Sequence, residues 1–529
     1  MHFNVVLLLL PLLQTLSAED CARFYPSTDD PSTFVCECSA ARCPSPVDPP
    51  FFSDLTSSPP IALLYRTSIE GDRLARHTLN ITTSRSIRKG PSTNDVTAQP
   101  IRLTIDRSKT FQKIIGFGGA ITDAAAINID LLNDEAAREK LLAAYFAQDG
   151  IGYTLARIPI GSCDFSTHEY SYADLDGDFA LSGFALAPED WRKIAYTKRA
   201  IDLAGDAGHK LKVFGSPWSA PAWMKTNGHM KGGGSLKPGT QFEQTWANYF
   251  VKFIEAYTAA GVPIWAVTTQ NEPSTGEDPD YSFQTMYLSP EEQQHFVRDL
   301  LHPAFSASRA ARDTQIMIFD DFRPNLPHWA DVTLNCSKAA AAIAGIAVHW
   351  YGDGAPPDNL DKTHAAHPDH FILGTEACVT DTHGVTLGNF TRGMMYANDI
   401  VQDLNHFVTG WVDWNIALDQ QGGPNWVANF VDSPIIVDAA KQTFYKQPMF
   451  YAMGQFSRFL SPGAVRIALT PEQKMNSVDT VAFRNPSGTI AVVLLNRGET
   501  TAEVEIVDDK KRIPLTLAKQ SINTVVYVE

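Results

Sequence analysis

The middle of the chain alternates short β-rich runs with longer segments of helical periodicity. The eight β-rich runs lie at 113–122, 151–161, 210–218, 264–273, 315–322, 346–351, 371–378 and 411–416. Helix candidates separate most of them, at 134–148, 188–207, 242–260, 290–309 and 392–407. These helices have Asp, Ser or Pro near their starts, as helix N-termini often do. Eight strands separated mostly by helices predict an α/β fold of the (β/α)8 TIM-barrel type.

A doubly wound α/β sheet is the rival fold. Such a sheet rarely needs eight strands, and it calls for a glycine-rich phosphate turn after its first strand. The segment 116–119 (GFGG) lacks the G-x-G-x-x-G spacing of that turn. We therefore favour the barrel and expect these glycines to allow close backbone packing at a strand.

After about residue 448 the pattern changes to short alternating runs, which predict a β-sandwich. They lie at 465–470, 480–483, 490–495, 504–507, 514–517 and 524–528. Strand-like runs also precede the barrel, at 61–67 and 101–105. We expect one discontinuous sandwich over 49–105 and 449–529, with the barrel over 106–448.

The N-terminus predicts export. Residues 5–13 (VVLLLLPLL) are apolar but too short to span a bilayer, and 15–18 (TLSA) supply the small residues of a signal-peptidase site. We interpret 1–18 as a signal peptide and find no later transmembrane stretch. Lumenal glycosylation would fit the three N-x-S/T sequons, Asn80, Asn335 and Asn389.

Four of the seven cysteines crowd the start of the mature chain. They are Cys21, Cys36, Cys38 and Cys43. In an oxidising lumen this pattern predicts two disulfides that staple a small flap over 19–48. A zinc knot is the alternative, but histidine partners and C-x-x-C spacing are missing. Cys163, Cys336 and Cys378 are scattered, so we expect buried free thiols.

The composition allows a large core and argues against a nucleic-acid partner. Hydrophobic residues make up 44% of the 529 residues, and 43 Lys and Arg against 59 Asp and Glu give a formal net charge of −16. This charge repels phosphate backbones and anionic lipid headgroups at neutral pH.

Two glutamates end predicted barrel strands. Glu272 closes the fourth run (TTQNEP) and Glu376 the seventh (LGTEAC). Strand C-termini meet at the active-site mouth of a barrel, and two carboxylates there suffice for glycoside cleavage. At about 5.5 Å their repulsion is about 3 kcal/mol, enough to keep one protonated near the working pH. Strand position leaves open which glutamate is the acid.

Residues beside these glutamates suit sugar binding. Asn271 can pair with a hydroxyl, and Asp164 can bind two hydroxyls or cap a loop. Aromatic side chains at other strand ends fit the apolar faces of pyranose rings, although some must be core residues. They are Trp218, Trp350, Tyr351, Trp411 and Trp414. Asp320, Asp321 and His349 lack the spacing of metal ligands, so we expect no metal and no cofactor.

Long segments make the chain recognisable. They are FQKIIGFGGAITDAAA from Phe111, SCDFS from Ser162, SPWSAPAWMKTNG from Ser216, QTWANYFVKF from Gln244, GIAVHWY from Gly345, TEACV from Thr375, GGPNWVANFVDSPIIVD from Gly422 and TFYKQPMFY from Thr443. Over nearly the whole mature chain the sequence resembles the acid glucosylceramidases of glycoside hydrolase family 30.

The resemblance implies a retaining exo-β-glucosidase that cleaves glucosylceramide in membranes, in the lysosome lumen or after secretion. It implies Glu272 as acid/base and Glu376 as nucleophile. Other implied pocket residues are Asp164, Trp218, Asn271, Trp414, Arg157, His349, Tyr351, Phe283 and Asn429. It also implies the disulfides Cys21–Cys36 and Cys38–Cys43, and help from a saposin-type activator and anionic lipid.

Two rival functions stay open. One is a β-glucosidase, β-xylosidase or β-1,6-glucanase acting on soluble sugars. The other is a catalytically silent sugar-binding protein, which the two intact glutamates disfavour.

Overall fold

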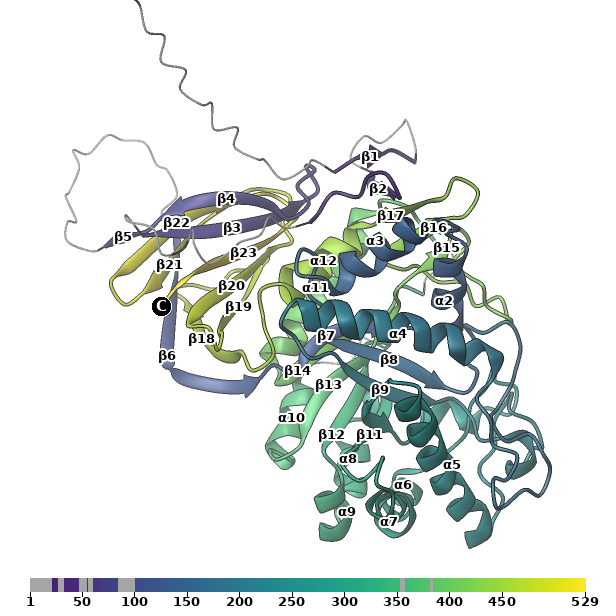
Figure 1. The fold of residues 1–529 in the computed structure, drawn as a ribbon. Coiled ribbons are helices and arrows are strands. Elements are labelled where there is room, and N and C mark those ends of the chain that lie inside the picture. The colour runs from purple at the N-terminus through teal and green to yellow at the C-terminus, as the bar shows by residue number, and fades with distance from the viewer. Residues whose placement is uncertain are drawn as a thin grey trace, which may run out of the picture.

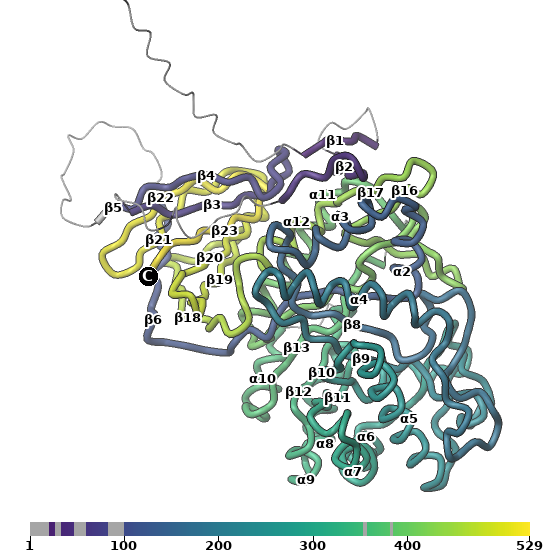
Figure 2. Tube along the Cα trace, in the orientation of Figure 1, coloured from purple at the N-terminus to yellow at the C-terminus, as the bar shows by residue number. Residues whose placement is uncertain are grey.

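The computed structural model describes residues 21–26, 33–46, 55, 60–83, 100–352, 357–380 and 384–529. The predicted signal peptide at 1–18 lies outside these residues, as do parts of the predicted flap and sandwich. Figures 1 and 2 show a barrel beside a β-rich domain, with a small flap near one end of the barrel. Within the described ranges no helix is both long and apolar enough to cross a membrane.

The predicted barrel is confirmed: eight parallel strands close in the order β10-β11-β12-β13-β14-β7-β8-β9 within the described chain. The strands are β7 Gly116–Ala120, β8 Leu155–Ile160, β9 Lys212–Pro217, β10 Ile264–Thr268, β11 Gln315–Phe322, β12 Gly345–His349, β13 Phe371–Glu376 and β14 Val408–Asn415. A Cβ at Gly118 would lie 2.0 Å from the Leu155 carbonyl oxygen. Glycine there allows β7 and β8 to approach closely, as the sequence predicted.

Helices lie around the outside of the barrel (Figure 1). The longer ones are α2 Asp123–Asp130, α3 Glu135–Phe146, α4 Pro188–Asp206, α5 Thr240–Ala259, α10 Asp358–Ala366, α11 Phe390–Asn405 and α12 Pro448–Ser457. Shorter ones are η1 Ala222–Met224, η2 Pro273–Glu277, α6 Pro290–Phe296, η3 Val297–Leu301, α7 His302–Ala307, η4 Arg323–Asn325, α8 His328–Thr333 and α9 Ser337–Ala342. A π-helical turn, η3, divides the predicted helix 290–309 into α6 and α7.

The sandwich is one sheet whose two halves face each other, with strand order β4-β3-β23-β20-β19-β18-β6-β21-β22-β5 in the part that the structure covers. Its strands are β3 Ile61–Ser68, β4 Ala75–Asn80, β5 Thr82–Thr83, β6 Ile101–Lys113, β18 Val465–Pro471, β19 Val478–Arg484, β20 Thr489–Asn496, β21 Ala502–Asp508, β22 Lys511–Leu517 and β23 Ser521–Val528. Leu64, Val492 and Ile513 share the core between the halves. Purple β3 and β4 lie beside yellow C-terminal strands (Figure 1), so the domain is discontinuous. The boundaries themselves stay a prediction.

The flap forms a third sheet with strands from the barrel's C-terminal segment, in the order β1-β2-β17-β16-β15 (these strands are labelled in Figure 1). These strands are β1 Arg23–Phe24, β2 Val35–Ser39, β15 Leu418–Asp419, β16 Ile435–Asp438 and β17 Thr443–Lys446. The disulfides Cys21–Cys36 and Cys38–Cys43 are confirmed. Because the sheet runs from β2 to β15 and β16, it connects the flap to the loop between those two strands.

The three remaining cysteines form no disulfide in the described structure. Cys163 and Cys378 are buried as expected, whereas Cys336 is only half-buried. Its place just before the short helix α9 leaves it partly open to solvent.

Candidate active site

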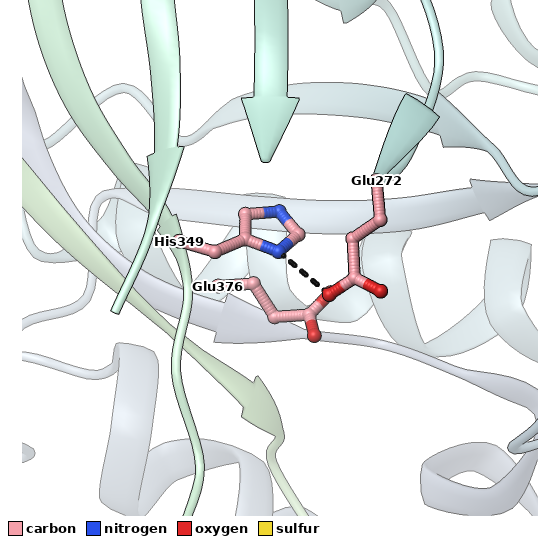
Figure 3. A group of neighbouring side chains, drawn as sticks. All are labelled: Glu272, His349 and Glu376. Atoms are coloured by element: carbon pink, nitrogen blue, oxygen red, sulfur yellow. Dashed lines mark hydrogen bonds and ion pairs between the residues drawn. The ribbon is translucent and has the colours of Figure 1, made fainter. Parts of the chain in front are cut away.

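Glu272 and Glu376 meet at the C-terminal end of the barrel (Figure 3). Glu376 is the last residue of β13, and Glu272 follows β10 with a left-handed φ of +42°. One oxygen of each carboxylate and one ring nitrogen of His349 all lie within 4.8 Å of one another. Both glutamates are 6% exposed, so they are nearly dry but reachable from the cavity above them.

The Glu376 carboxylate accepts two hydrogen bonds. Arg157 on β8 donates from Nη1 to its Oε2, and the Tyr351 hydroxyl donates to its Oε1 over 2.9 Å. Arg157 Nη2 also donates to Asn271 Oδ1 over 2.8 Å. These donors fix both oxygens of Glu376 and stabilise negative charge on them.

Glu272 has a different environment. His349 lies 3.1 Å from its Oε1 through Nδ1, and the Tyr281 hydroxyl donates to its Oε2 over 3.3 Å. Burial raises the pKa of Glu272 to about 7, although the nearby His349 charge acts in the opposite direction. A carboxyl group with this pKa holds a proton in mildly acidic solution.

Asp320 on β11 lies beneath both glutamates and is fully buried. Its Oδ2 accepts from Arg157 Nη2 over 2.9 Å, and its Oδ1 faces His349 Nε2 at 3.0 Å. Burial alone would raise the pKa of Asp320, but the charges of Arg157 and His349 outweigh it and hold that pKa well below its usual range.

A cavity of about 470 Å³ opens above the carboxylates. Trp218 and Trp414 stack at its base with ring centroids 5.1 Å apart and an interplanar angle of 21°. Asn429 on its wall and the neighbouring Asn425 donate to Asp164 Oδ2 over 3.0 and 3.1 Å. Burial raises the pKa of Asp164 to about 7. Stacked rings beside hydroxyl-binding groups suit a sugar.

Most of the site residues proposed from the sequence line this cavity. They are Asp164, Trp218, Asn271, Glu272, Phe283, Tyr351, Glu376, Trp414 and Asn429. Arg157 and His349 lie behind the glutamates with no exposed surface. Of the aromatic candidates, Trp350 and Trp411 instead belong to the buried core.

The sequence reasoning missed several polar residues of the site, among them Tyr281, Asn425 and Asp320, and also Ser282 and Thr380 in the cavity lining. Tyr281 and Asn425 lie on loops, where no periodicity indicates direction. The sequence does indicate Asp320, because it lies near the end of a predicted barrel strand as the glutamates do. Considered only as a metal ligand together with Asp321, it lacks the spacing that such a site needs.

The cluster of Glu272, His349 and Glu376 resembles a metal site only in its spacing. The two ring nitrogens of His349 face Glu272 and Asp320, and the charges of Glu376 and Asp320 raise the pKa of His349 to about 10 despite its burial. Because each ring nitrogen already faces a carboxylate oxygen, the arrangement suits proton transfer between these groups.

Comparisons with known proteins agree with this geometry. The Glycosyl hydrolase family 30 TIM-barrel domain matches residues 114–460, and the family 30 beta sandwich domain matches 463–525. Lysosomal acid glucosylceramidase of Mus musculus is 42% identical over 487 residues, covering 90% of each chain. Endo-1,6-beta-D-glucanase neg1 of Aspergillus fumigatus is 29% identical over 420 residues, covering 75% of this chain and 81% of the glucanase. The crystal structure of SrfJ from Salmonella typhimurium superposes with a TM-score of 0.80 at 26% identity, covering 89% of this chain and all of SrfJ.

Proposed function

This chain belongs to glycosyl hydrolase family 30, and we propose that it is a retaining exo-β-glucosidase that hydrolyses glucosylceramide to glucose and ceramide. That the chain is a glycoside hydrolase follows from its family and relatives. The observation that carries the retaining mechanism is the approach of the Glu272 and Glu376 oxygens to within 4.8 Å. Retaining enzymes hold their carboxyl groups about 5–5.5 Å apart, whereas inverting enzymes need about 6.5–9.5 Å to admit a water.

In the first step Glu272 acts as the acid. It gives its proton to the oxygen that joins glucose to ceramide, while an oxygen of Glu376 bonds to the anomeric carbon and the glycosidic bond breaks. Ceramide leaves as an alcohol. The raised pKa of Glu272 and the two donors on Glu376 support this assignment.

In the second step Glu272 acts as the base. Its carboxylate takes a proton from water, the water oxygen bonds to the anomeric carbon, and the ester bond to Glu376 breaks. Glucose leaves with its original anomeric configuration, and both glutamates return to their starting states.

We assign glucose to the space above the Trp218–Trp414 stack. Asp164 and Asn271 line it and present groups suited to sugar hydroxyls, and Asn429 holds Asp164 in place. Tyr351 and Phe283 form the walls, while Arg157 and His349 support the two glutamates from behind. This arrangement suits a single terminal sugar, which is the basis for proposing exo action.

An acidic lumen fits the chemistry. Below about pH 7 Glu272 holds the proton that the first step needs, and acid also reduces the repulsion between this chain and anionic lipid. We therefore place the enzyme in the lysosome lumen or outside the cell, reached through the signal peptide at 1–18. A saposin-type activator with anionic lipid would bring it to the membrane, and Asn80 and Asn335, both exposed, are suitable glycosylation sites.

A mechanism-based label tests nucleophile, anomer and sugar together. An activated 2-deoxy-2-fluoro-β-glucoside should trap one glucosyl group on the peptide that contains Glu376. Glu376→Gln is the matched control and should remain unlabelled. Steady turnover with no trapped intermediate, or a label on another residue, would overturn the mechanism.

Soluble β-glucans are the second candidate substrate, favoured by the likeness to endo-1,6-beta-D-glucanase neg1. Fluorescent glucosylceramide in detergent and in anionic liposomes at about pH 5, an aryl β-glucoside, and β-1,6-linked gluco-oligosaccharides should be compared. We expect turnover of the lipid and the aryl glucoside. Turnover of the oligosaccharides without the lipid would replace the lipid assignment.

A further inference from the structure

We propose that Asp320 is a positioning residue that keeps the two glutamates in different states, by holding Arg157 against Glu376 and His349 against Glu272. The inference rests on the proposed function, because it gives the two glutamates the roles of acid and nucleophile. Asp320 itself does not line the cavity and cannot touch a substrate bound there.

Four side chains that can donate hydrogen bonds face the Asp320 carboxylate. Oδ2 accepts from Arg157 at 2.9 Å and from Thr268 Oγ1 at 2.7 Å. Oδ1 accepts from Thr375 Oγ1 at 2.6 Å and faces His349 Nε2 at 3.0 Å. An ionised carboxylate can accept all four bonds, whereas an amide in its place would turn two hydrogens towards donors.

The backbone conformation places the Asp320 carboxylate within reach of these four donors. Phe319 and Asp320 both have left-handed φ angles, +76° and +57°, and the pairing of β11 with β12 skips a residue between Phe319 and Asp321. This bulge turns the Asp320 side chain towards Arg157 and His349. Its own carbonyl oxygen accepts the Glu272 N–H over 2.8 Å, which ties the two residues together.

The charge of the Asp320 carboxylate determines the protonation states of its neighbours through charge balance. Arg157 and the His349 imidazolium carry two positive charges, and Asp320 and ionised Glu376 carry two negative ones. Glu272 is then neutral, which is the protonated form that an acid needs. If Asp320 lost its charge, the buried cluster would have a surplus positive charge. His349 is the group that should then release its proton, because its Nε2 faces Asp320 directly at 3.0 Å and would lose that partner.

Several groups face this pair from neighbouring elements. The charges of Glu376 and Asp320 raise the pKa of His349 against the effect of burial. The pKa of Glu272 is raised by burial, lowered by His349, and raised to a lesser degree by Glu376 and Asp321. Tyr281 donates to Glu272 from the loop above it. Loss of the imidazolium should therefore let Glu272 keep its proton to higher pH and weaken it as a base in the second step.

Asp320→Asn tests the proposal, with Asp321→Asn as the matched control. Asp321 is the adjacent buried aspartate, but the hydrogen bonds that it accepts in the described structure come from Ser274 and the Phe322 N–H, not from Arg157 or His349. For aryl β-glucoside turnover we expect D320N to lower kcat about 100-fold or more with KM changed less than about threefold. The basic limb of kcat/KM against pH should move up by about one pH unit. D321N should not move it upward, because the Asp321 charge raises the pKa of Glu272.

A basic limb that stays in place in D320N, or that moves up equally in D321N, would overturn the proposal. Thermal unfolding shows whether D320N is folded. If D320N does not fold, the variant H349Q is compared with the double variant D320N/H349Q instead. The double variant lacks the His349 imidazolium, so the loss of Asp320 leaves no charge at position 349 without its partner. The two should have the same basic limb, and a further shift in the double variant would contradict action through His349.

This test can fail separately from the proposed function. If wild type carries the fluoroglucosyl label on Glu376 but D320N behaves like D321N, only the proposed role of Asp320 is refuted. If the label is absent, the proposed roles of Glu272 and Glu376 are refuted.

Discussion

Forming the glucosyl ester on Glu376 should convert Glu272 from an acid into a base. Esterification removes the negative charge of Glu376, whose oxygen lies within 4.8 Å of an oxygen of Glu272. Without that neighbouring anion the ionised form of Glu272 is favoured, so its proton leaves at a lower pH.

The separation sets the size of the effect. At 4.8 Å and an effective dielectric constant of about 20, the repulsion between two unit charges is about 3.5 kcal/mol. Division by 1.36 kcal/mol per pH unit gives an upper limit of about two to three pH units. The change should be smaller than this limit, because burial contributes more than Glu376 to the raised pKa of Glu272. Glu272 should therefore titrate with a pKa near 7 in the free enzyme, where the burial of the carboxyl group keeps it protonated, and well below that in the ester.

Two pH profiles measure the two states. The basic limb of kcat/KM for an aryl β-glucoside reports loss of the acid in the free enzyme. Enzyme trapped with the 2-fluoroglucoside and freed of excess reagent regains activity as water hydrolyses the ester. The acidic limb of that reactivation rate reports when Glu272 becomes the base.

We expect the acidic limb of reactivation to lie about one to two pH units below the basic limb of kcat/KM. A Glu272→Gln enzyme, trapped in the same way, should reactivate slowly with no acidic limb in that range. Limbs that coincide within about half a pH unit would refute the Coulombic reasoning.

Three further predictions concern the acid role of Glu272, a buried lysine and a disulfide. Glu272→Gln should lower turnover of a methylumbelliferyl glucoside about 10²- to 10⁴-fold. The glycosylation step with a dinitrophenyl glucoside should be slowed less, because that leaving group needs no acid. Equal losses with the two substrates would contradict the acid role. Burial lowers the pKa of Lys446 to about 7. The unfolded chain therefore binds this proton more readily than the folded protein, and the free energy of unfolding decreases as the pH falls from about 10 to 7. Denaturant unfolding should show Lys446→Met gaining about 4 kcal/mol more, relative to wild type, at pH 6 than at pH 10, and a gain independent of pH would be evidence against this. Replacing Cys38 and Cys43 by serine should cost about 2 kcal/mol of unfolding free energy and also lower kcat/KM, because β2 belongs to the sheet that supports the Asn429 loop; unchanged kinetics would show that the flap and the cavity are independent.

The barrel could be predicted because each strand is short, apolar and followed by a helix. Glu272 and Glu376 could be proposed because both end such strands. Asp320 could not be separated from Asp321 in this way, since a regular strand would not show which of two adjacent aspartates faces inward. That choice is made by the bulge at Phe319 and Asp320, whose left-handed backbone nothing in the sequence indicates.

The supports of Asp164 gave no local signal for a different reason: Asn425 was missed, and Asn429 could be proposed only through the family resemblance. Asn425 and Asn429 lie in the loop between β15 and β16, far along the chain from Asp164. Their direction depends on a sheet that pairs β17 with the flap strand β2, and on a loop held near Asp164 by the bond from the Trp426 N–H to its carbonyl oxygen. Long-range pairing of this kind leaves no local pattern in the sequence.

The discontinuous sandwich determines the order in which parts of the chain can fold during synthesis. Ser68 in β3 pairs with Ser521 in β23, so β3 has no partner on that side until almost the whole chain has left the ribosome. The barrel between them is complete earlier and can fold while this edge stays open. A premature stop before β23 would therefore release a molecule that has all eight barrel strands and both glutamates, but also an exposed, aggregation-prone edge at β3.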